Sequence, residues 1–78
     1  MDRVLNEAEK VWLRDVFHYH TPSEAQLQQY IRIRDGAGDF ARVVMLTCPP
    51  SADRSAALRK IREAVMTANA SIALEGKG

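Results

Sequence analysis

The stretch that decides the fold is Thr47-Cys48-Pro49-Pro50-Ser51-Ala52-Asp53, which lies past the middle of the 78-residue chain. Proline has no amide proton and cannot continue a helix, so the two consecutive prolines end the helix before them. Ser51 is a preferred N-cap, and Asp53 suits the first turn of a new helix, where the helix dipole favours negative charge. Two long helices with so short a connection pack as antiparallel neighbours. The stretch therefore predicts a helical hairpin.

The segments on both sides of this turn have helical periodicity. The residues that recur at steps of three and four are Leu27, Tyr30, Arg34, Ala37, Ala41, Val44 and Cys48 before the turn, and Leu58, Ile61, Val65, Ala68 and Ile72 after it. We expect one helix over residues 23–47, more than about 30 Å long at about 1.5 Å per residue, and another over residues 52–74. Ile31, Ile33 and Phe40 widen the apolar surface of the first of these helices, which therefore needs more than one neighbour.

A second turn, His18-Tyr19-His20-Thr21-Pro22, separates the hairpin from an N-terminal segment. Thr21 as N-cap and Glu24 at the third helical position predict a capping box, with Pro22 in the first helical position between them. An apolar stripe upstream predicts a helix over residues 2–17, with Asp2 at its favourable end. The residues of this stripe are Leu5, Ala8, Trp12 and Val16.

The sequence thus predicts an all-α fold: an antiparallel hairpin of two long helices plus an N-terminal helix. We interpret residues 1–78 as a single helical domain, with the N-terminal helix in 1–17 and the hairpin core with a short frayed tail in 18–78. A domain this small is marginal alone and usually needs disulfides, a metal or partner subunits. Cys48 is the single cysteine, and metal-ligand spacing is missing. Self-association is the remaining route to stability.

Composition argues against several functional classes. A net charge of +1 disfavours binding to duplex DNA, and no apolar run approaches the roughly 18 residues of a membrane span. The N-terminus lacks the apolar core of a signal peptide, so we expect a cytosolic protein. An enzyme is disfavoured because Cys48 ends one hairpin helix while His18 and His20 precede its start. Gly36-Ala37-Gly38 matches no phosphate-binding loop, and we expect no cofactor and no metal.

Binding is better supported than catalysis, through the cluster of Phe17, His18, Tyr19 and His20. Aromatic faces stack on nucleobases, and imidazoles donate to phosphate or to a base edge. From composition alone, however, the favoured interpretation is that Phe17 and Tyr19 fasten the first helix to the hairpin.

Three further features leave alternatives open. Arg34 has the chemistry to clamp phosphate, although its spacing favours pairing with Asp35 or Asp39 on a solvated face. The two mid-helix glycines mark either a tolerated weak spot or the close approach of a backbone or ligand. Asn69 is a polar residue on the packed seam of the last helix, where such residues usually set register or cap a neighbour's backbone.

Several short motifs, in order, resemble the phage cyclic-nucleotide sponges that defeat bacterial CBASS defence. They are Phe-x-Tyr-His-x-Pro (17–22), Ile-Arg (33–34), Cys-Pro-x-Ser (48–51), Arg-Ser-x-Ala-Leu (54–58), Glu-Ala-Val-Met (63–66) and Ala-Asn-Ala-x-Ile-Ala (68–73). The sponges that counter Thoeris defence share a related hairpin and are more distant. The resemblance implies a phage-encoded homohexamer in the host cytoplasm. Members sequester cyclic dinucleotides such as cyclic GMP-AMP between protomers without cleaving them, and some hold cyclic trinucleotides at separate sites.

By motif, the resemblance also implies roles for individual residues. Tyr19 matches the family tyrosine that packs on a base, and Arg34 suits a phosphate contact. His20 and Pro22 would shape the turn that bears the tyrosine. Phe17 and Ile33 would be apolar walls of the pocket; the full set of expected ligand-binding residues is Tyr19, Arg34, His20, Phe17, Pro22, Ile33 and Gly38.

Two departures from the family pattern bear on affinity and on the number of sites. Gly38 stands where many relatives carry lysine, which lowers the expected attraction for phosphate, and Leu74 stands where many carry arginine. If that arginine serves the trinucleotide site, the site is absent or altered here. The alternative function is a small helical protein-interaction or regulatory module without a nucleotide ligand.

Overall fold

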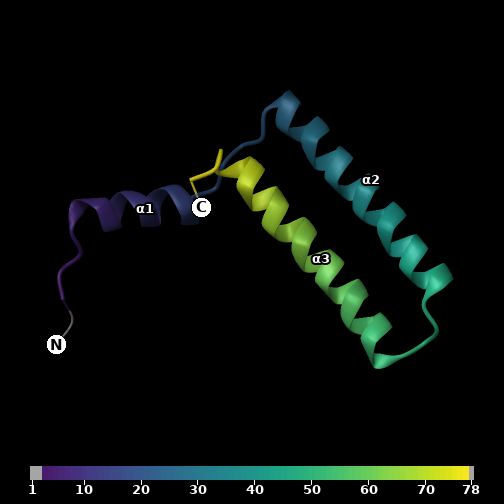
Figure 1. Ribbon diagram of the computed structural model, residues 1–78. Coiled ribbons are helices and arrows are strands. Elements are labelled where there is room, and N and C mark those ends of the chain that lie inside the picture. Colours follow the sequence, from purple (N-terminus) through teal and green to yellow (C-terminus); the bar gives the residue numbers. More distant parts are fainter. Residues whose placement is uncertain (1–2, 78) are drawn as a thin grey trace.

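The computed structural model describes residues 3–77, which form three helices: α1 (Glu7–Phe17), α2 (Glu24–Thr47) and α3 (Ala52–Ala73). Helices α2 and α3 lie side by side as an antiparallel hairpin, while α1 points away from the open end of the hairpin (Figure 1). Within the described chain, α2 and α3 are the only pair of helices in contact. The predicted all-α hairpin with a separate N-terminal helix is confirmed.

The turn between the long helices is built as the prolines predict. Cys48 is the C-cap of α2, and its amide donates to the carbonyl of Val44. Ser51 is the N-cap of α3, and its hydroxyl accepts from the amide of Arg54 at 3.1 Å. Arg54 also reaches back to the Cys48 carbonyl, which ties the start of α3 to the end of α2.

The predicted capping box of α2 is wrong, because the helix uses a neighbouring one that begins two residues later. Ser23, not Thr21, is the N-cap, and the reciprocal partner is Gln26, not Glu24. The Ser23 hydroxyl accepts from the Gln26 amide at 3.1 Å, and the Gln26 side chain accepts from the Ser23 amide at 2.9 Å. Gln26 can also donate, and it does so to α3, which a carboxylate at Glu24 could not do. Pro22 therefore precedes the cap instead of opening the helix.

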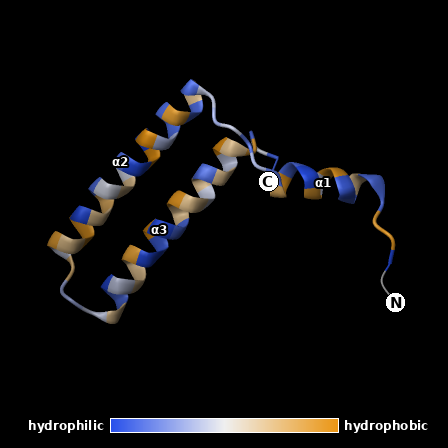
Figure 2. Ribbon diagram, turned by 180° about the vertical axis from the view of Figure 1, so that it is seen from behind, coloured by the Kyte–Doolittle hydropathy of each residue, from blue (hydrophilic) through white to orange (hydrophobic). Residues whose placement is uncertain are grey.

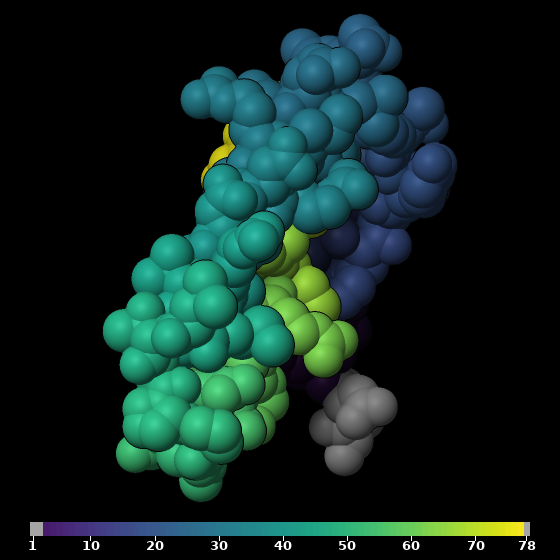
Figure 3. Space-filling model, turned by 90° about the vertical axis from the view of Figure 1, so that its right-hand side faces the viewer, coloured from purple at the N-terminus to yellow at the C-terminus, as the bar shows by residue number. Residues whose placement is uncertain are grey.

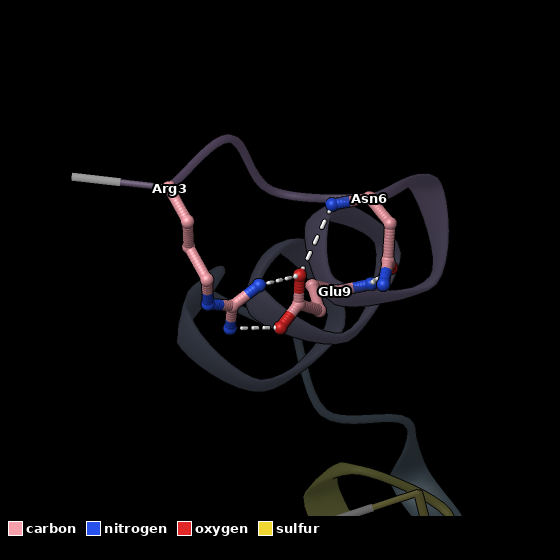
Figure 4. Close-up of polar contacts among 3 residues, drawn as sticks. All are labelled: Arg3, Asn6 and Glu9. Atoms are coloured by element: carbon pink, nitrogen blue, oxygen red, sulfur yellow. Dashed lines mark hydrogen bonds and ion pairs between the residues drawn. The ribbon is translucent and has the colours of Figure 1, made fainter.

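Helix α1 begins later than predicted. Asn6 is its N-cap and forms a capping box with Glu9, so the helix starts at Glu7 and not near residue 2. Arg3 forms a two-pronged ion pair with the Glu9 carboxylate, which also accepts from the Asn6 amide (Figure 4). These bonds hold the pKa of Glu9 below its ordinary value, chiefly through Arg3. The predicted contribution of Asp2 lies outside the described residues.

The end of α3 is an ordered turn, so the predicted frayed tail is wrong for residues 75–77. The Gly76 amide donates to the Ser71 carbonyl at 3.0 Å and the Glu75 amide to the Ile72 carbonyl at 3.2 Å. This is the Schellman pattern, in which the first residue past the cap is left-handed and usually glycine. Here Glu75 takes that position at φ 52°, followed by Gly76 at φ 81°.

The hairpin has almost no core of its own. Val44 is the one buried hydrophobic residue among those described, and the α3 seam residues that the periodicity identified are only half-buried. Hydrophobic positions recur along all three helices (Figure 2), and α3 is visible at the surface beside α2 (Figure 3). The radius of gyration is 17.3 Å, against about 11–12 Å for a compact chain of this length.

The accessible surface area also shows that the protomer buries less surface than a compact monomer of its mass. It is 6508 Å², against about 4,700 Å² for a compact monomer of this mass. The excess of about 1,800 Å² on one protomer is about twice the roughly 800 Å² that each partner contributes to a protein–protein interface of standard size. None of the described helices is long and apolar enough to cross a membrane.

The two mid-helix glycines do not interrupt α2, which runs unbroken through both. A Cβ atom built at Gly36 or Gly38 meets nothing within 4 Å. No backbone therefore approaches either glycine within the protomer.

Candidate ligand-binding site

The turn between α1 and α2 carries Tyr19 at the open end of the hairpin. The Tyr19 side chain is 80% exposed, so its ring is free to stack on a ligand. It borders a hollow of about 320 Å³, which we call the Tyr19 hollow. The residues that line the Tyr19 hollow are Tyr19, His20, Thr21 and Gln26 from the turn and α2, and Ala73, Leu74, Glu75 and Lys77 from the end of α3.

His20 is held in place by the end of α1. Its Nε2 atom lies within hydrogen-bonding distance of the carbonyl oxygen of Asp15, and because a carbonyl only accepts, Nε2 carries the proton. This contact satisfies one of the last carbonyls of α1 and fixes the turn that bears Tyr19.

Arg34 lies in a second hollow, of about 440 Å³, one to two turns further along the hairpin. Tyr30 of α2 and Met66 and Asn69 of α3 line it with Arg34, and Ala73 lines both this hollow and the Tyr19 hollow. The ion pairs among residues 3–77 are Arg3–Glu9 and Lys10–Glu7, so Arg34 is not neutralised by the described carboxylates. The expected pairing with Asp35 or Asp39 is therefore wrong.

Asn69 borders the Arg34 hollow in an unusual state. Its Oδ1 atom is buried and accepts no hydrogen bond from the described residues. A buried acceptor without a donor costs about 1–3 kcal/mol. The predicted capping of a neighbour's backbone is thus not made by this oxygen within the protomer.

Ile33 lines neither the Tyr19 hollow nor the Arg34 hollow. It lies in a long apolar groove between α2 and α3, and it also lines a depression of about 560 Å³ that includes Gln26 and Glu75 of the Tyr19 hollow. The groove has a volume of about 660 Å³ and is lined largely by small and apolar side chains. Its lining residues are Ile33, Gly36, Ala37, Phe40, Ala57, Lys60, Ile61, Ala64, Val65 and Ala68. Gly36 lines this groove, whereas Gly38 is not among its lining residues.

The remaining expected site residues lie outside the Tyr19 hollow. Phe17 is 75% exposed and packs edge-to-face on Trp12, with ring centroids 5.9 Å apart. Because α1 does not contact the hairpin, the expectation that Phe17 and Tyr19 fasten it there is wrong. Pro22 is half-buried next to the Ser23 cap, where it restricts the preceding Thr21 to extended backbone.

Among the residues of the Tyr19 hollow that sequence reasoning did not place in the site, Lys77 and Gln26 are the most informative. Lys77 was assigned to a frayed tail, and the Schellman turn that brings it back is unusual because its left-handed residue is not glycine. Gln26 was overlooked because the neighbouring Thr21-Pro22-Ser23-Glu24 also fits a capping box. The signal that could have found it is Ser23-Glu24-Ala25-Gln26, an equally good match.

The chemistry of these hollows is that of binding. Each is lined by both an aromatic side chain and a cation, Tyr19 with Lys77 and Tyr30 with Arg34, which suits a base and a phosphate. Cys48 lies 24 helical residues away from the turn with the histidines, at the far end of α2. Among residues 3–77, no three His, Cys, Asp or Glu side chains gather in a way that could hold a metal ion.

Comparison with known families matches this architecture. The family model of the Acb2/Tad1 hairpin domain matches residues 9–73, from the first turns of α1 to the last residue of α3. No curated protein and no solved structure matched the chain. The matched stretch covers most of the chain and includes the Tyr19 turn and both hairpin helices. The chain therefore belongs to the Acb2/Tad1 hairpin domain family, the phage anti-CBASS and anti-Thoeris sponge family.

Proposed function

We propose that this protein binds cyclic oligonucleotide second messengers, above all cyclic dinucleotides such as cyclic GMP-AMP, and sequesters them without cleavage so that CBASS effectors stay inactive. The sponges of its family are non-enzymatic binders with an anti-defence role in the host cell. The mechanism is mass action, because a tight binder lowers the free signal below the level that the effector needs. The ligand, the choice of CBASS and the host cytoplasm as site of action are part of this proposal.

The observation that carries the proposal is the Tyr19 hollow. A ring that is four-fifths exposed on a hydrogen-bonded turn contributes little to the protomer's own packing. The same hollow contains Lys77, and the Arg34 hollow shares Ala73 with it. Stacking surface and positive charge thus lie close together, as the bases and phosphates of a cyclic dinucleotide require.

We further propose that the protein acts as a homo-oligomer, a homohexamer by family resemblance. The apolar groove, the exposed α1 and the excess surface support self-association, since one protomer cannot cover them. Pockets that close around a ligand then form between protomers, where both hollows are extended by a second copy. Cyclic trinucleotides are a second class of ligand that the family resemblance suggests.

The test is binding followed by recovery of the ligand. Purified protein is incubated with cyclic GMP-AMP, freed of unbound ligand and heat-denatured, and we expect the intact cyclic molecule in the supernatant. Recovery of linear or cleaved nucleotide would indicate an enzyme. Tyr19→Ala should weaken binding roughly 5- to 150-fold, since stacking on an aromatic ring contributes about 1–3 kcal/mol per base, and should leave the oligomer intact.

The alternative, a protein-interaction or regulatory module without a nucleotide ligand, is favoured by a different observation. Trp12 and Phe17 of α1 are 50% and 75% exposed, and such an amphipathic helix is a common docking element. Calorimetry with a panel of cyclic di- and trinucleotides separates the two functions, because the alternative predicts no heat of binding with any of them.

A further inference from the structure

The side chain of Gln26 joins the two helix ends between which the Tyr19 hollow lies. Its Oε1 accepts from the amide of Ser23, and its Nε2 donates to the carbonyl of Ile72, at 3.0 Å and 46 residues away in sequence. Among the side-chain hydrogen bonds of the described residues, the Ile72 bond connects α2 with α3 at the open end of the hairpin, whereas the bond from Arg54 to Cys48 connects them at the closed end. One amide therefore binds the start of α2 and the end of α3 at once.

The carbonyl that Gln26 contacts belongs to the turn that carries Lys77. Ile72 also accepts from the amide of Glu75, the left-handed residue of the Schellman turn. Beyond it, the Lys77 amide donates to the Leu74 carbonyl at 3.0 Å. Gln26 thus fixes the base of the turn on one side of the hollow, and through Ser23 it fixes the N-cap residue that follows the Tyr19 turn on the other.

Only an amide of this length can make both contacts. A carboxylate accepts from Ser23 but has no donor for Ile72, and an apolar side chain has neither. Glutamate is itself a standard capping-box residue at this position, so local helix capping alone does not require glutamine. The donor end of Gln26 is explained by the bridge to α3.

We propose that Gln26 is a positioning residue for ligand binding: its amide bridge sets the separation of the Tyr19 turn from the Glu75–Lys77 turn, and so the width of the Tyr19 hollow. The proposal rests on the function proposed above for the ligand itself, but its geometric part does not depend on it. Gln26 lines the hollow together with Tyr19 and Lys77, so a ligand held there spans the bridge.

Gln26→Glu and Ser23→Ala form a matched pair that separates the bridge from the cap. Gln26→Glu keeps the acceptor for the Ser23 amide and loses the donor to Ile72. Ser23→Ala loses the hydroxyl that caps α2, at about 1 kcal/mol of stability, but keeps the bridge. We expect Gln26→Glu to weaken binding of cyclic GMP-AMP tenfold or more, and Ser23→Ala to change it less than about twofold despite its larger effect on thermal stability.

If cyclic GMP-AMP does not bind, that result contradicts the proposed function alone. A measurement without ligand then still tests the role of Gln26. In hydrogen–deuterium exchange, Gln26→Glu should speed exchange at the amides of residues 19–21 and 75–77, and Ser23→Ala should not. Acidification should slow exchange in Gln26→Glu again, because a protonated carboxyl regains a donor for Ile72. The wild-type protein at the same pH values is the control for the titration of the other groups near the hollow, His20, Glu75 and Lys77. The inference would be overturned if Gln26→Glu exchanged these amides at the wild-type rate, or if both variants lost equal affinity for cyclic GMP-AMP.

Discussion

Replacing Phe40 by alanine should disrupt self-association far more than it disrupts the hairpin. Phe40 lines the apolar groove and is 59% exposed in the protomer. A phenylalanine side chain offers about 200 Å², so about 120 Å² of it remains for a second copy to cover. At about 25 cal/mol per Å² this area is worth about 3 kcal/mol, of which alanine retains about a third. The expected loss is about 2 kcal/mol for each Phe40 removed, which is roughly 30-fold in the dissociation constant per substituted protomer of the assembly.

Sedimentation velocity over a dilution series measures that constant. Leu46→Ala is the matched control, because Leu46 is 79% exposed on the same helix but is not among the residues that line the groove. Circular dichroism at each concentration measures helix content, and so shows whether losing the part of Phe40 that packs within the hairpin unfolds the protomer. A wild-type protein that sediments as a monomer at its highest soluble concentration, or a Phe40→Ala variant that associates as tightly as the wild type, would refute the reasoning.

The remaining predictions concern stability. Glu75→Gly should raise the unfolding free energy by about 1 kcal/mol, because glycine relieves the left-handed strain, while Gly76→Ala should lower it by a similar amount; urea melts measure both. Asn69→Ala should stabilise the protomer by about 1 kcal/mol, since it removes a buried acceptor without a partner, and a loss of stability would instead reveal a hidden donor. The bonds from Arg3 lower the pKa of Glu9, so they stabilise α1 above the ordinary value of 4.5 and are lost as the pH falls through the lowered pKa. The helicity of residues 7–17, followed by NMR chemical shifts, should therefore decline more in acid in the wild type than in Glu9→Gln, which keeps only the Glu7–Lys10 pair of the two ion pairs in this region.

Local signals in the sequence were sufficient for the hairpin. The two prolines and Ser51 define the turn, and the step of three and four finds Ile61 and Val65 on the face where they are half-buried. The errors in the secondary structure lie at helix ends, where several capping motifs compete. Gln26, not Glu24, is the capping-box partner, and it also bonds to Ile72, 46 residues away in sequence. No local sequence pattern contains the information about that contact.

The candidate site was predictable in part. Tyr19 and His20 do line a common hollow, but Lys77 joins them only because Glu75 adopts a conformation that its residue type disfavours. Arg34 lies in a separate hollow, and Ile33 lies in the apolar groove and in a depression that shares Gln26 and Glu75 with the Tyr19 hollow. A single chain does not reveal which of these depressions join, because a pocket shared between copies is specified by packing between chains.

Under the proposed function, the small core and the candidate site have a common explanation, which is binding of the ligand between copies of the chain. An 11-residue helix such as α1 is marginal in water without packing, and Val44, at 8% exposed, is the one buried hydrophobic residue among those described. A ligand that binds the assembled protein and not the unfolded chain stabilises it by RT ln(1 + [L]/Kd), about 2.7 kcal/mol at a hundredfold excess over Kd. That is comparable to a disulfide, which this chain, with Cys48 as its single cysteine, cannot form internally. A cyclic nucleotide held between copies would then supply the cross-link, so thermal stability should rise with ligand concentration more steeply in the wild type than in Tyr19→Ala.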